Sequence, residues 1–342
     1  MVDDSRRAAT PLCISGGNTK AFYGRSTRGM SCDVSGHRGV IAYEPTELVI
    51  TARGGTPLRE IEALLHDHGQ MLPFEPPHFA ASATLGGSVA AGLAGPRRPY
   101  AGAVRDFVLG VKYINGQGEV LSCGGQVMKN VAGYDISRLM AGSLGTLGIL
   151  LEVSVKVLPR PAQELTLRLE MDTEQAIATM NRWAGQPLPL SAACLLGGVV
   201  YVRLSGTEAG VRAAAGKIGG DVMDNDGAFW HELKEQQLPF FQSSQPLWRI
   251  SLAPGTPPLT LPGAELIDWG GAQRWLCSDA PAPKVREQAQ RAGGHATVFR
   301  GGDRHGEVFR PLPEAMMAFH RRLKKAFDPY GIFNPGRMYP DL

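Results

Sequence analysis

Three separated glycine-rich segments constrain the fold of this chain more than any other feature. The first reads ISGGNTKAFYG and follows a short apolar stretch. Its Gly-Gly pair can adopt backbone conformations that a Cβ would forbid, so successive N–H groups can point into one concavity and surround phosphate oxygens. The candidate residues are Gly16, Gly17, Asn18, Thr19 and Lys20. The segment predicts a diphosphate-binding loop, and a plain turn is the alternative.

The second segment, Gln70 to Gly95, combines a proline-rich entry with another Gly-Gly pair and a run of small side chains. Its part from Thr84 to Gly92 predicts a helix whose free N–H groups face an anion. The residues nearest that anion would be Gly86, Gly87 and Ser88. Close packing of this helix on a sheet is an equally good interpretation.

The third segment, Lys129 to Pro159, has glycines at 142, 145 and 148 directly before a run that favours a β-strand. Because glycine has no side chain, these repeated glycines again allow the backbone to approach a buried group closely. We expect Tyr134 and Asp135 to start a helix, where the carboxylate opposes the N-terminal dipole.

The composition excludes several classes of protein. The 342 residues are 43% hydrophobic and 20% charged, which suits a globular protein of two domains. The chain has neither an apolar run long enough to span a membrane nor the apolar core of a secretion signal. A net charge of +3 with scattered basic residues does not predict nucleic-acid binding. The five cysteines form no C-x-x-C pair, so we expect no zinc or iron–sulfur site and a cytoplasmic location.

Strands and helices alternate along the first half of the chain. Residues 46–52 favour a strand, and a helix is predicted after it with Thr56 as N-cap, Pro57 at its first position and Gly69 beyond its end. Residues 107–123 predict a hairpin that turns at Asn115 and Gly116.

The second half predicts a smaller α+β domain. From residue 161 to about 306 the order of elements is β-α-β-β-α-β, with helices over 173–183 and 208–218. A hairpin that carries Trp269 and Trp275 follows. The aromatic residues here are typical of a core, and a surface for a partner is the alternative.

Two common nucleotide-binding motifs are absent. The chain has no G-x-x-x-x-G-K-[ST], and the Gly116-Gln117-Gly118 stretch lies in the predicted hairpin with Leu121 where a third glycine belongs. P-loop and Rossmann folds are therefore excluded.

Five motifs in order carry a resemblance to a known family. They are ISGGNTKAFYG, ATLGGSVAAGLAGPRR, RDFVLGVKYINGQGEV, KNVAGYDISRLMAGSLGTLGILLEVSVKVLPRP and FDPYGIFNPGRM. Their order resembles the flavoproteins of the vanillyl-alcohol-oxidase and p-cresol-methylhydroxylase (PCMH) type. More narrowly, EPTELVITARGGTPLREIE and GQMLPFEPPH resemble the FAD-binding subunit of bacterial glycolate oxidase.

The resemblance implies an α+β fold class, with a two-subdomain PCMH-type FAD-binding domain and a small ferredoxin-like cap domain. The expected boundaries are residues 1–160 for the FAD-binding domain, 161–306 for the cap and 307–342 for a C-terminal segment that returns to the first domain. Three glycine-rich segments lining one elongated cofactor agree with this picture.

The resemblance also implies the residues that bind FAD. In addition to the first loop with Gly24 at its end, the expected residues are Thr84, Gly86, Gly87, Ser88, Gly92, Gly142, Thr146, Gly148, Ile149, Asn334 and Arg337. Arg337 would be a fixed cation near the flavin ring, and a surface arginine after a turn is the alternative.

Two departures from the family pattern affect the chemistry. Members that bind flavin covalently often have a histidine where this chain has Thr19, so we expect non-covalent FAD. The metal-binding H-x-G-D-G-N-x-H stretch of relatives that act on 2-hydroxy acids is absent, and His295 and His305 are typical of structural histidines. We expect no metal and identify no residue that abstracts a proton from substrate.

The resemblance implies an FAD-dependent 2-hydroxy-acid oxidoreductase subunit that oxidises glycolate to glyoxylate within a complex. The expected partners are a second flavoprotein subunit and an iron–sulfur subunit, and membrane association would occur only through them. The alternative is a non-catalytic FAD-binding or scaffolding paralogue whose companion flavoprotein performs the substrate chemistry. A free-standing dehydrogenase with a soluble acceptor fits less well, because the substrate site is missing.

Overall fold

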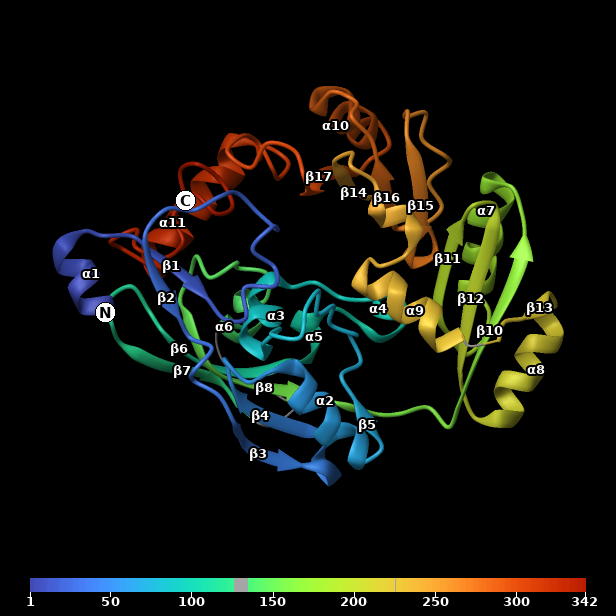
Figure 1. Cartoon of the computed structure of the whole chain (residues 1–342), viewed down its shortest axis with the longest axis horizontal. Helices are drawn as coiled ribbons and strands as arrows, with labels where there is room; N and C mark the ends of the chain where they lie inside the picture. The colour runs from blue at the N-terminus through green and yellow to red at the C-terminus, as the bar shows by residue number, and fades with distance from the viewer. Residues whose placement is uncertain (126–134, 225) are drawn as a thin grey trace. The chain divides into compact units, whose positions relative to one another are not determined.

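The computed structural model describes residues 1–125, 135–224 and 226–342 (Figure 1). The chain divides into two compact units. Unit 1 comprises Met1–Ala94, Ala103–Pro159 and Asp303–Leu342, and unit 2 comprises Gly95–Gly102 and Arg160–Gly302. The units differ from the predicted domains chiefly in Gly95–Gly102, which we expected in the first domain.

Unit 1 has two subdomains. The elements of the first are α1 (Val2–Ala8), β1 (Leu12–Ser15), β2 (Met30–Asp33) and α11 (Glu314–Phe327). Strands β1 and β2 pair in parallel, and Phe333 from the C-terminal segment forms a further parallel bridge to Leu12. Leu12, Phe333 and Ile332 are buried together with Cys32 and Ile149. The C-terminal segment is therefore part of the core that supports β1.

The second subdomain is a five-stranded antiparallel sheet with short helices. Its elements are β3 (Val40–Glu44), η1 (Pro45–Glu47), β4 (Val49–Arg53), α2 (Leu58–Asp67), β5 (Gln70–Met71), α3 (Leu85–Ala91), α5 (Val104–Phe107), β6 (Val108–Ile114), β7 (Val120–Gly124), α6 (Ile136–Met140), β8 (Ile149–Lys156) and β9 (Leu158–Pro159). The strand order is β3-β4-β8-β6-β7, and β5 pairs separately with β9. Opposite each other on β4 and β8, the hydroxyls of Thr51 and Ser154 lie 2.8 Å apart.

Most local predictions for unit 1 are confirmed. Strands β6 and β7 form the expected hairpin, and α3 follows Thr84 and ends at Gly92, which has a φ of 65°. Asp135 caps α6 by accepting from the Arg138 N–H at 3.1 Å, whereas Tyr134 lies outside the described residues.

The predicted start of α2 is wrong by one residue. Pro57 is its N-cap, and the Thr56 hydroxyl instead accepts a hydrogen bond from the Gly39 N–H at 2.9 Å. A contact between loops therefore outweighed the local preference of threonine for a capping position.

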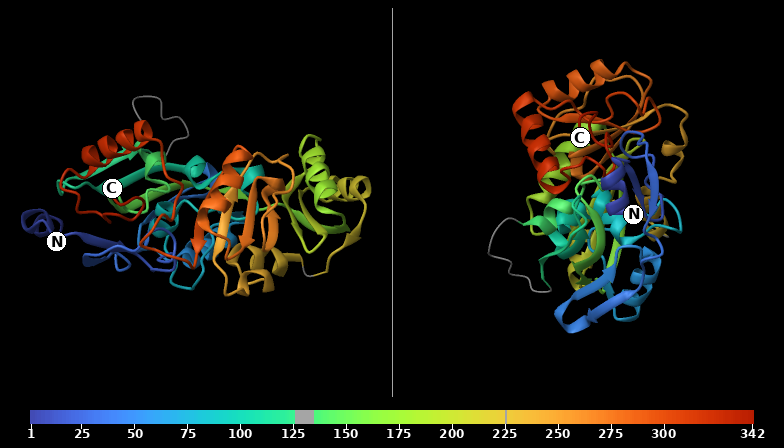
Figure 2. Two further views of the ribbon diagram at one scale, coloured as in Figure 1. Left: turned by 90° about the horizontal axis from the view of Figure 1, so that it is seen from above. Right: turned by 90° about the vertical axis from the view of Figure 1, so that its left-hand side faces the viewer.

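Unit 2 contains one eight-stranded sheet (Figures 1 and 2). Its elements are α4 (Arg98–Ala101), β10 (Gln163–Glu170), α7 (Thr173–Ala184), β11 (Leu190–Leu196), β12 (Val199–Gly206), α8 (Glu208–Ile218), β13 (Asp221–Val222), α9 (Asp226–Glu235), η2 (Pro239–Gln242), β14 (Leu247–Ser251), β15 (Ala264–Asp268), η3 (Trp269–Gly271), β16 (Gln273–Cys277), α10 (Ala282–Arg291) and β17 (His295–Arg300). The strand order is β13-β10-β12-β11-β15-β16-β14-β17.

The first six elements of unit 2 after α4 confirm the predicted β-α-β-β-α-β order. Residues of α7 and α8 share one buried cluster with Leu167, Val202 and Leu204, so both helices cover the same face of the sheet. Adjacent strand residues point to opposite faces. The hydrogen bond from Trp230 Nε1 to the Thr166 hydroxyl, at 2.8 Å, therefore places α9 on the other face.

The tryptophan-bearing hairpin extends this same sheet, which the sequence did not indicate. Strand β15 pairs with β11, where Ile267 lies opposite Leu195. Strands β16, β14 and β17 follow β15 in the order of the sheet. Trp230, Trp248 and Trp275 are buried, so these aromatic side chains belong mainly to the core.

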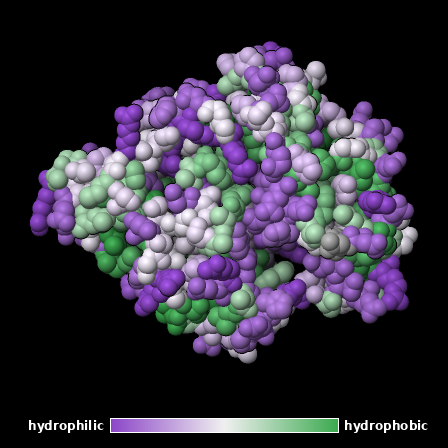
Figure 3. All heavy atoms as spheres, in the orientation of Figure 1, coloured by the Kyte–Doolittle hydropathy of each residue, from purple (hydrophilic) through white to green (hydrophobic). Residues whose placement is uncertain are grey.

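No helix in the described part of the chain is long and apolar enough to cross a membrane. On the face drawn in Figure 3, hydrophilic residues are interspersed with smaller groups of hydrophobic ones.

Candidate functional site

A cavity of about 440 Å³ lies within unit 1, where the glycine-rich segments meet the C-terminal segment. Many of the predicted site residues line it: Gly16, Gly17, Asn18, Thr19, Lys20, Thr84, Gly86, Gly87, Gly148, Asn334 and Arg337. The fold thus brings together segments that are far apart in the sequence. Cys13, Ser26 and Thr27 also line the cavity and were not predicted.

Other predicted residues are not among those that line the cavity: Gly24, Ser88, Gly92, Gly142, Thr146 and Ile149. Gly92 and Gly142 allow two loops to touch, because a Cβ on Gly92 would lie 2.9 Å from the Gly142 Cα. The Thr146 hydroxyl donates to the Ser143 carbonyl at 2.7 Å, so it supports its own loop. Ser88 is buried, and its hydroxyl has no hydrogen-bond partner among the described residues.

The loop after β1 has backbone donors that find no backbone acceptor in the part of the chain that the structure describes. No backbone carbonyl of the described residues accepts a hydrogen bond from the N–H groups of Gly17, Asn18 or Thr19. Asn18 has a φ of 55°, a left-handed conformation that directs neighbouring N–H groups toward a common point. At Gly17 only glycine fits, because a Cβ would lie 1.5 Å from the Ser82 carbonyl oxygen. This backbone can bind an anion.

The start of α3 is different, and the expectation of free N–H groups there is wrong. The Leu85 N–H donates to the Thr56 carbonyl at 2.9 Å, and the Gly86 N–H donates to the Gly54 carbonyl at 2.8 Å. The Gly87 N–H donates to the Thr84 hydroxyl at 3.2 Å. Since these donors are satisfied, close packing of the helix is the interpretation that holds.

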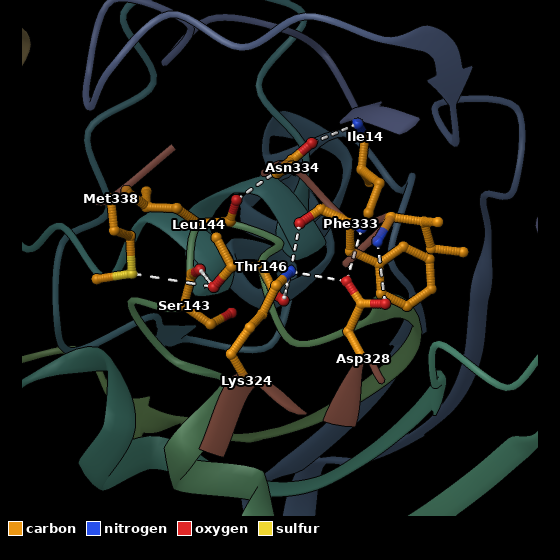
Figure 4. A network of polar contacts seen from close by, with 10 residues as sticks. Ile14, Ser143, Leu144, Thr146, Lys324, Asp328, Phe333, Asn334 and Met338 are labelled. Carbon is orange, nitrogen blue, oxygen red and sulfur yellow. Dashed lines mark hydrogen bonds and ion pairs between the residues drawn. The ribbon is translucent and has the colours of Figure 1, made fainter. Parts of the chain in front are cut away.

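Asn334 ties two of the cavity-forming segments together (Figure 4). Its Oδ1 accepts from the Ile14 N–H at 2.7 Å, and its Nδ2 donates to the Leu144 carbonyl at 2.8 Å. A Cβ on Gly145 would lie 2.7 Å from that Nδ2, so the amide fits closely against bare backbone. Asn334 therefore sets the distance between β1 and the third glycine-rich segment.

Arg337 holds the first loop from its far end. Its Nη1 donates to the Arg25 carbonyl at 3.0 Å, and its Nη2 donates to the carbonyls of Lys20 at 3.3 Å and Ala21 at 3.0 Å. Burial lowers the pKa of this guanidinium, yet arginine stays charged because its ordinary pKa is so high. Arg337 is thus neither a surface residue nor a cation with all its donors available to a ligand.

Lys20 is held beside the same loop. Its Nζ donates to the Thr19 hydroxyl at 3.3 Å and to the His78 carbonyl at 3.4 Å, and it lies 5.7 Å from the centre of the Phe79 ring. The ammonium therefore adds positive charge to the wall that carries the unpaired amides.

The C-terminal segment contains a buried ion pair that was not predicted from the sequence. Lys324 Nζ donates to Asp328 Oδ2 at 2.7 Å, to the Thr146 carbonyl at 2.8 Å and to the Phe333 carbonyl at 2.7 Å (Figure 4). Burial lowers the pKa of Lys324, and the Asp328 carboxylate opposes that shift. The spacing of four residues within HRRLKKAFDPYG is the one sequence signal that could have indicated the pair.

The described residues contain no group of three or more His, Cys, Asp or Glu side chains that could hold a metal ion. His305 donates its backbone N–H to Asp303 Oδ1 at 2.8 Å, which is a local turn contact.

Comparison with known proteins identifies the family. Residues 1–124 match the family described as FAD binding domain, and residues 301–338 match FAD linked oxidases, C-terminal domain. Over 333 residues the chain is 54% identical to glycolate oxidase subunit GlcE of Escherichia coli (strain K12), covering 97% of this chain and 94% of that protein. The chain belongs to the GlcE family. The resemblance noted in the sequence is confirmed, and FAD is the cofactor of this FAD-linked oxidase family.

Other proteins are similar to the chain at lower identity. Glycolate oxidase subunit GlcD of Bacillus subtilis (strain 168) is 33% identical over 128 residues, covering 37% of this chain and 27% of that protein. The solved structure of p-cresol methylhydroxylase with substrate bound superposes with a TM-score of 0.70 at 15% identity, covering 99% of this chain and 86% of that one. The predicted fold class is confirmed.

The residues of the cavity fit FAD. A diphosphate group requires hydrogen-bond donors and space. The donors are three amides that have no backbone acceptor among the described residues, with a lysine beside them, and the space is left by glycines in the wall.

Proposed function

We propose that this chain is the FAD-carrying subunit of a glycolate oxidase complex. In that complex glycolate is oxidised to glyoxylate, which removes two electrons and two protons from the substrate. Bound FAD supplies the two-electron acceptor, and an iron–sulfur subunit would then receive the electrons. The extent of the similarity to a glycolate oxidase subunit supports this proposal.

The observation that carries the proposal is the loop from Gly17 to Thr19, whose N–H groups have no backbone acceptor within residues 1–125, 135–224 and 226–342. These three amides would bind the diphosphate of FAD, each contributing about 1.5 to 3 kcal/mol as a charge-assisted hydrogen bond. Arg337 would keep the loop in this conformation through its carbonyl contacts, and Lys20 would offset the negative charge. The chain's own residues thus bind and orient the cofactor.

We propose the same cofactor role for the remaining predicted residues. Gly86, Gly87 and Gly148 would contact the cofactor through bare backbone at the cavity wall. The predicted residues that do not line the cavity would act indirectly, by fixing the loops that do. They are Gly24, Ser88, Gly92, Gly142, Thr146 and Ile149.

A second candidate function is an FAD-binding paralogue whose companion flavoprotein subunit performs the substrate chemistry. It is favoured by the absence from the sequence of the H-x-G-D-G-N-x-H stretch. In both cases the chain binds flavin, so flavin content alone does not separate them.

The experiment is to purify the chain alone and in the complex with its partner subunits, and to add glycolate without oxygen. We expect a yellow isolated chain whose flavin is not bleached by glycolate, and a complex whose flavin is bleached. A chain that never carries flavin would contradict the proposal.

To separate the two candidates, the complex is reassembled with a flavin-free loop variant of this chain. Unchanged glycolate turnover would favour the paralogue.

A further inference from the structure

The C-terminal segment contributes a set of buried polar contacts to the cavity, which we name the clasp and define as Lys324, Asp328, Phe333 and Asn334. Lys324 is 8% exposed and Asp328 is 2% exposed. An ammonium has three donors, and all three are used here, by a carboxylate and two backbone carbonyls. The clasp is therefore saturated and has one preferred geometry.

The carboxylate of Asp328 fixes the other end of the clasp. Its Oδ1 accepts from the Ile332 N–H at 3.1 Å, and its Oδ2 accepts from the Phe333 N–H at 2.8 Å as well as from Lys324. This closes the chain between α11 and Asn334 into a tight loop. The position of Asn334 thus depends on the ion pair that precedes it.

The clasp reaches the third glycine-rich segment at two points. Lys324 binds the Thr146 carbonyl, 178 positions away in the sequence, and Asn334 binds the Leu144 carbonyl, 190 positions away. Between these points lies Gly145, which lines the cavity, as does Gly148 just beyond them. The backbone of this wall is therefore held by side chains that do not belong to it.

We propose that Lys324 is a positioning residue for the cofactor, because it holds the Leu144–Gly148 backbone at the cavity wall. This inference rests on the proposed function, since it requires that FAD occupies the cavity. It makes docking of the C-terminal segment and binding of FAD interdependent. Such coupling is reciprocal: FAD must stabilise the clasp by the same factor by which the clasp strengthens FAD binding.

The matched pair of variants is Lys324→Met and Lys325→Met. Both remove one ammonium from adjacent positions of α11, but Lys325 is exposed and is not part of the clasp, whereas Lys324 is buried within it. The dissociation constant for FAD is measured by flavin fluorescence on the apoprotein, together with the thermal unfolding midpoint. We expect Lys324→Met to raise the dissociation constant at least tenfold and Lys325→Met to change it less than twofold.

Amide hydrogen exchange tests the reciprocal effect. In the wild-type protein, adding FAD should slow exchange at residues 142–148 and 328–334 together. In Lys324→Met the second stretch should no longer respond to FAD. A merely structural lysine would lower the unfolding midpoint without altering this response.

If Lys324→Met does not fold, the double variant Lys324→Met with Asp328→Asn removes the unpaired buried carboxylate and is tested in its place. A folded variant that binds FAD within twofold of wild type would overturn the inference and leave the proposed function intact. Wild-type protein that binds no FAD would overturn both.

Discussion

The guanidinium of Arg337 donates a hydrogen bond to the backbone carbonyl of Ala21 at 3.0 Å, although the two residues are 316 positions apart. This contact links the last part of the chain to the loop that carries the unpaired amides. Because the donor is charged and partly buried, and its acceptors are backbone oxygens, Arg337 restricts the conformations that this loop can adopt.

Replacing this arginine tests how far the loop depends on it. Arg337→Ala removes one hydrogen-bond donor from each of three carbonyls, of which that of Lys20 keeps the Tyr23 N–H. Arg337→Lys cannot reproduce the planar fork that reaches all three. We expect the dissociation constant for FAD to rise at least about tenfold in Arg337→Ala, which is about 1.4 kcal/mol, and by less in Arg337→Lys. Arg322→Ala, on the exposed side of α11, is the control. Equal FAD affinities of Arg337→Ala and the control would refute the role of Arg337 in holding the loop.

Gly17 offers a test of the loop backbone itself. The added Cβ of Gly17→Ala would meet the Ser82 carbonyl, whereas a Cβ on exposed Gly36 meets nothing within 4 Å. We expect Gly17→Ala to lose at least about 2 kcal/mol in the free energy of unfolding, to reposition the loop and to lose bound flavin. Denaturant unfolding and flavin absorbance measure the two effects. Gly36→Ala should retain both, and a yellow, stable Gly17→Ala protein would contradict the geometry.

Glu164 predicts an acid-sensitive contact in unit 2. Burial opposes its ionisation, but the charge of Arg203, the hydrogen bond from the Ser205 hydroxyl and the charge of Arg97 outweigh burial and lower its pKa. The stability that Glu164 contributes is therefore complete above pH 4.5, the ordinary pKa of glutamate, and is lost as the pH falls below it through the lowered pKa.

We expect the free energy of unfolding of Glu164→Gln to fall less steeply below pH 4.5 than that of the wild type. Glu208→Gln, on the exposed side of α8, should follow the wild type. Tryptophan fluorescence can monitor this transition selectively, since all five tryptophans lie in unit 2. An acid transition of Glu164→Gln that coincides with that of the wild type would rule out the contribution.

The attachment of FAD can be tested by acid precipitation. Thr19 stands where covalently flavinylated relatives often carry a histidine, and a threonine hydroxyl offers no comparable nucleophile. We expect all of the flavin to appear in the supernatant after the protein is precipitated, measured by its visible absorbance. Flavin that stays with the pellet would show a covalent bond.

Signals that act over a few residues could be read from the sequence. Helix α3 lies between Thr84 and Gly92 as predicted. Helix α8 covers 208–218 as predicted, because its capping and apolar spacing are local properties. Gly16 and Gly17 indicated the loop, but not for the expected reason. Neither has a positive φ, and a Cβ on each would instead meet Thr84 or Ser82, far along the chain. The α2 boundary was missed because the Thr56 side chain binds Gly39, outside the reach of a local rule.

By itself, the sequence determined the glycine-rich loop after β1, the β-α-β-β-α-β order in unit 2 and the family. Only the tertiary structure decided which amides are unpaired, what Arg337 contacts and that Lys324 is buried, because each depends on a partner far along the chain. At α3 the carbonyls of Thr56 and Gly54 accept from the N–H groups, whereas no described backbone carbonyl accepts from those of Gly17 to Thr19. Two segments of similar composition thus differ in chemistry, since backbone donors bind a ligand only where the fold leaves them without an acceptor.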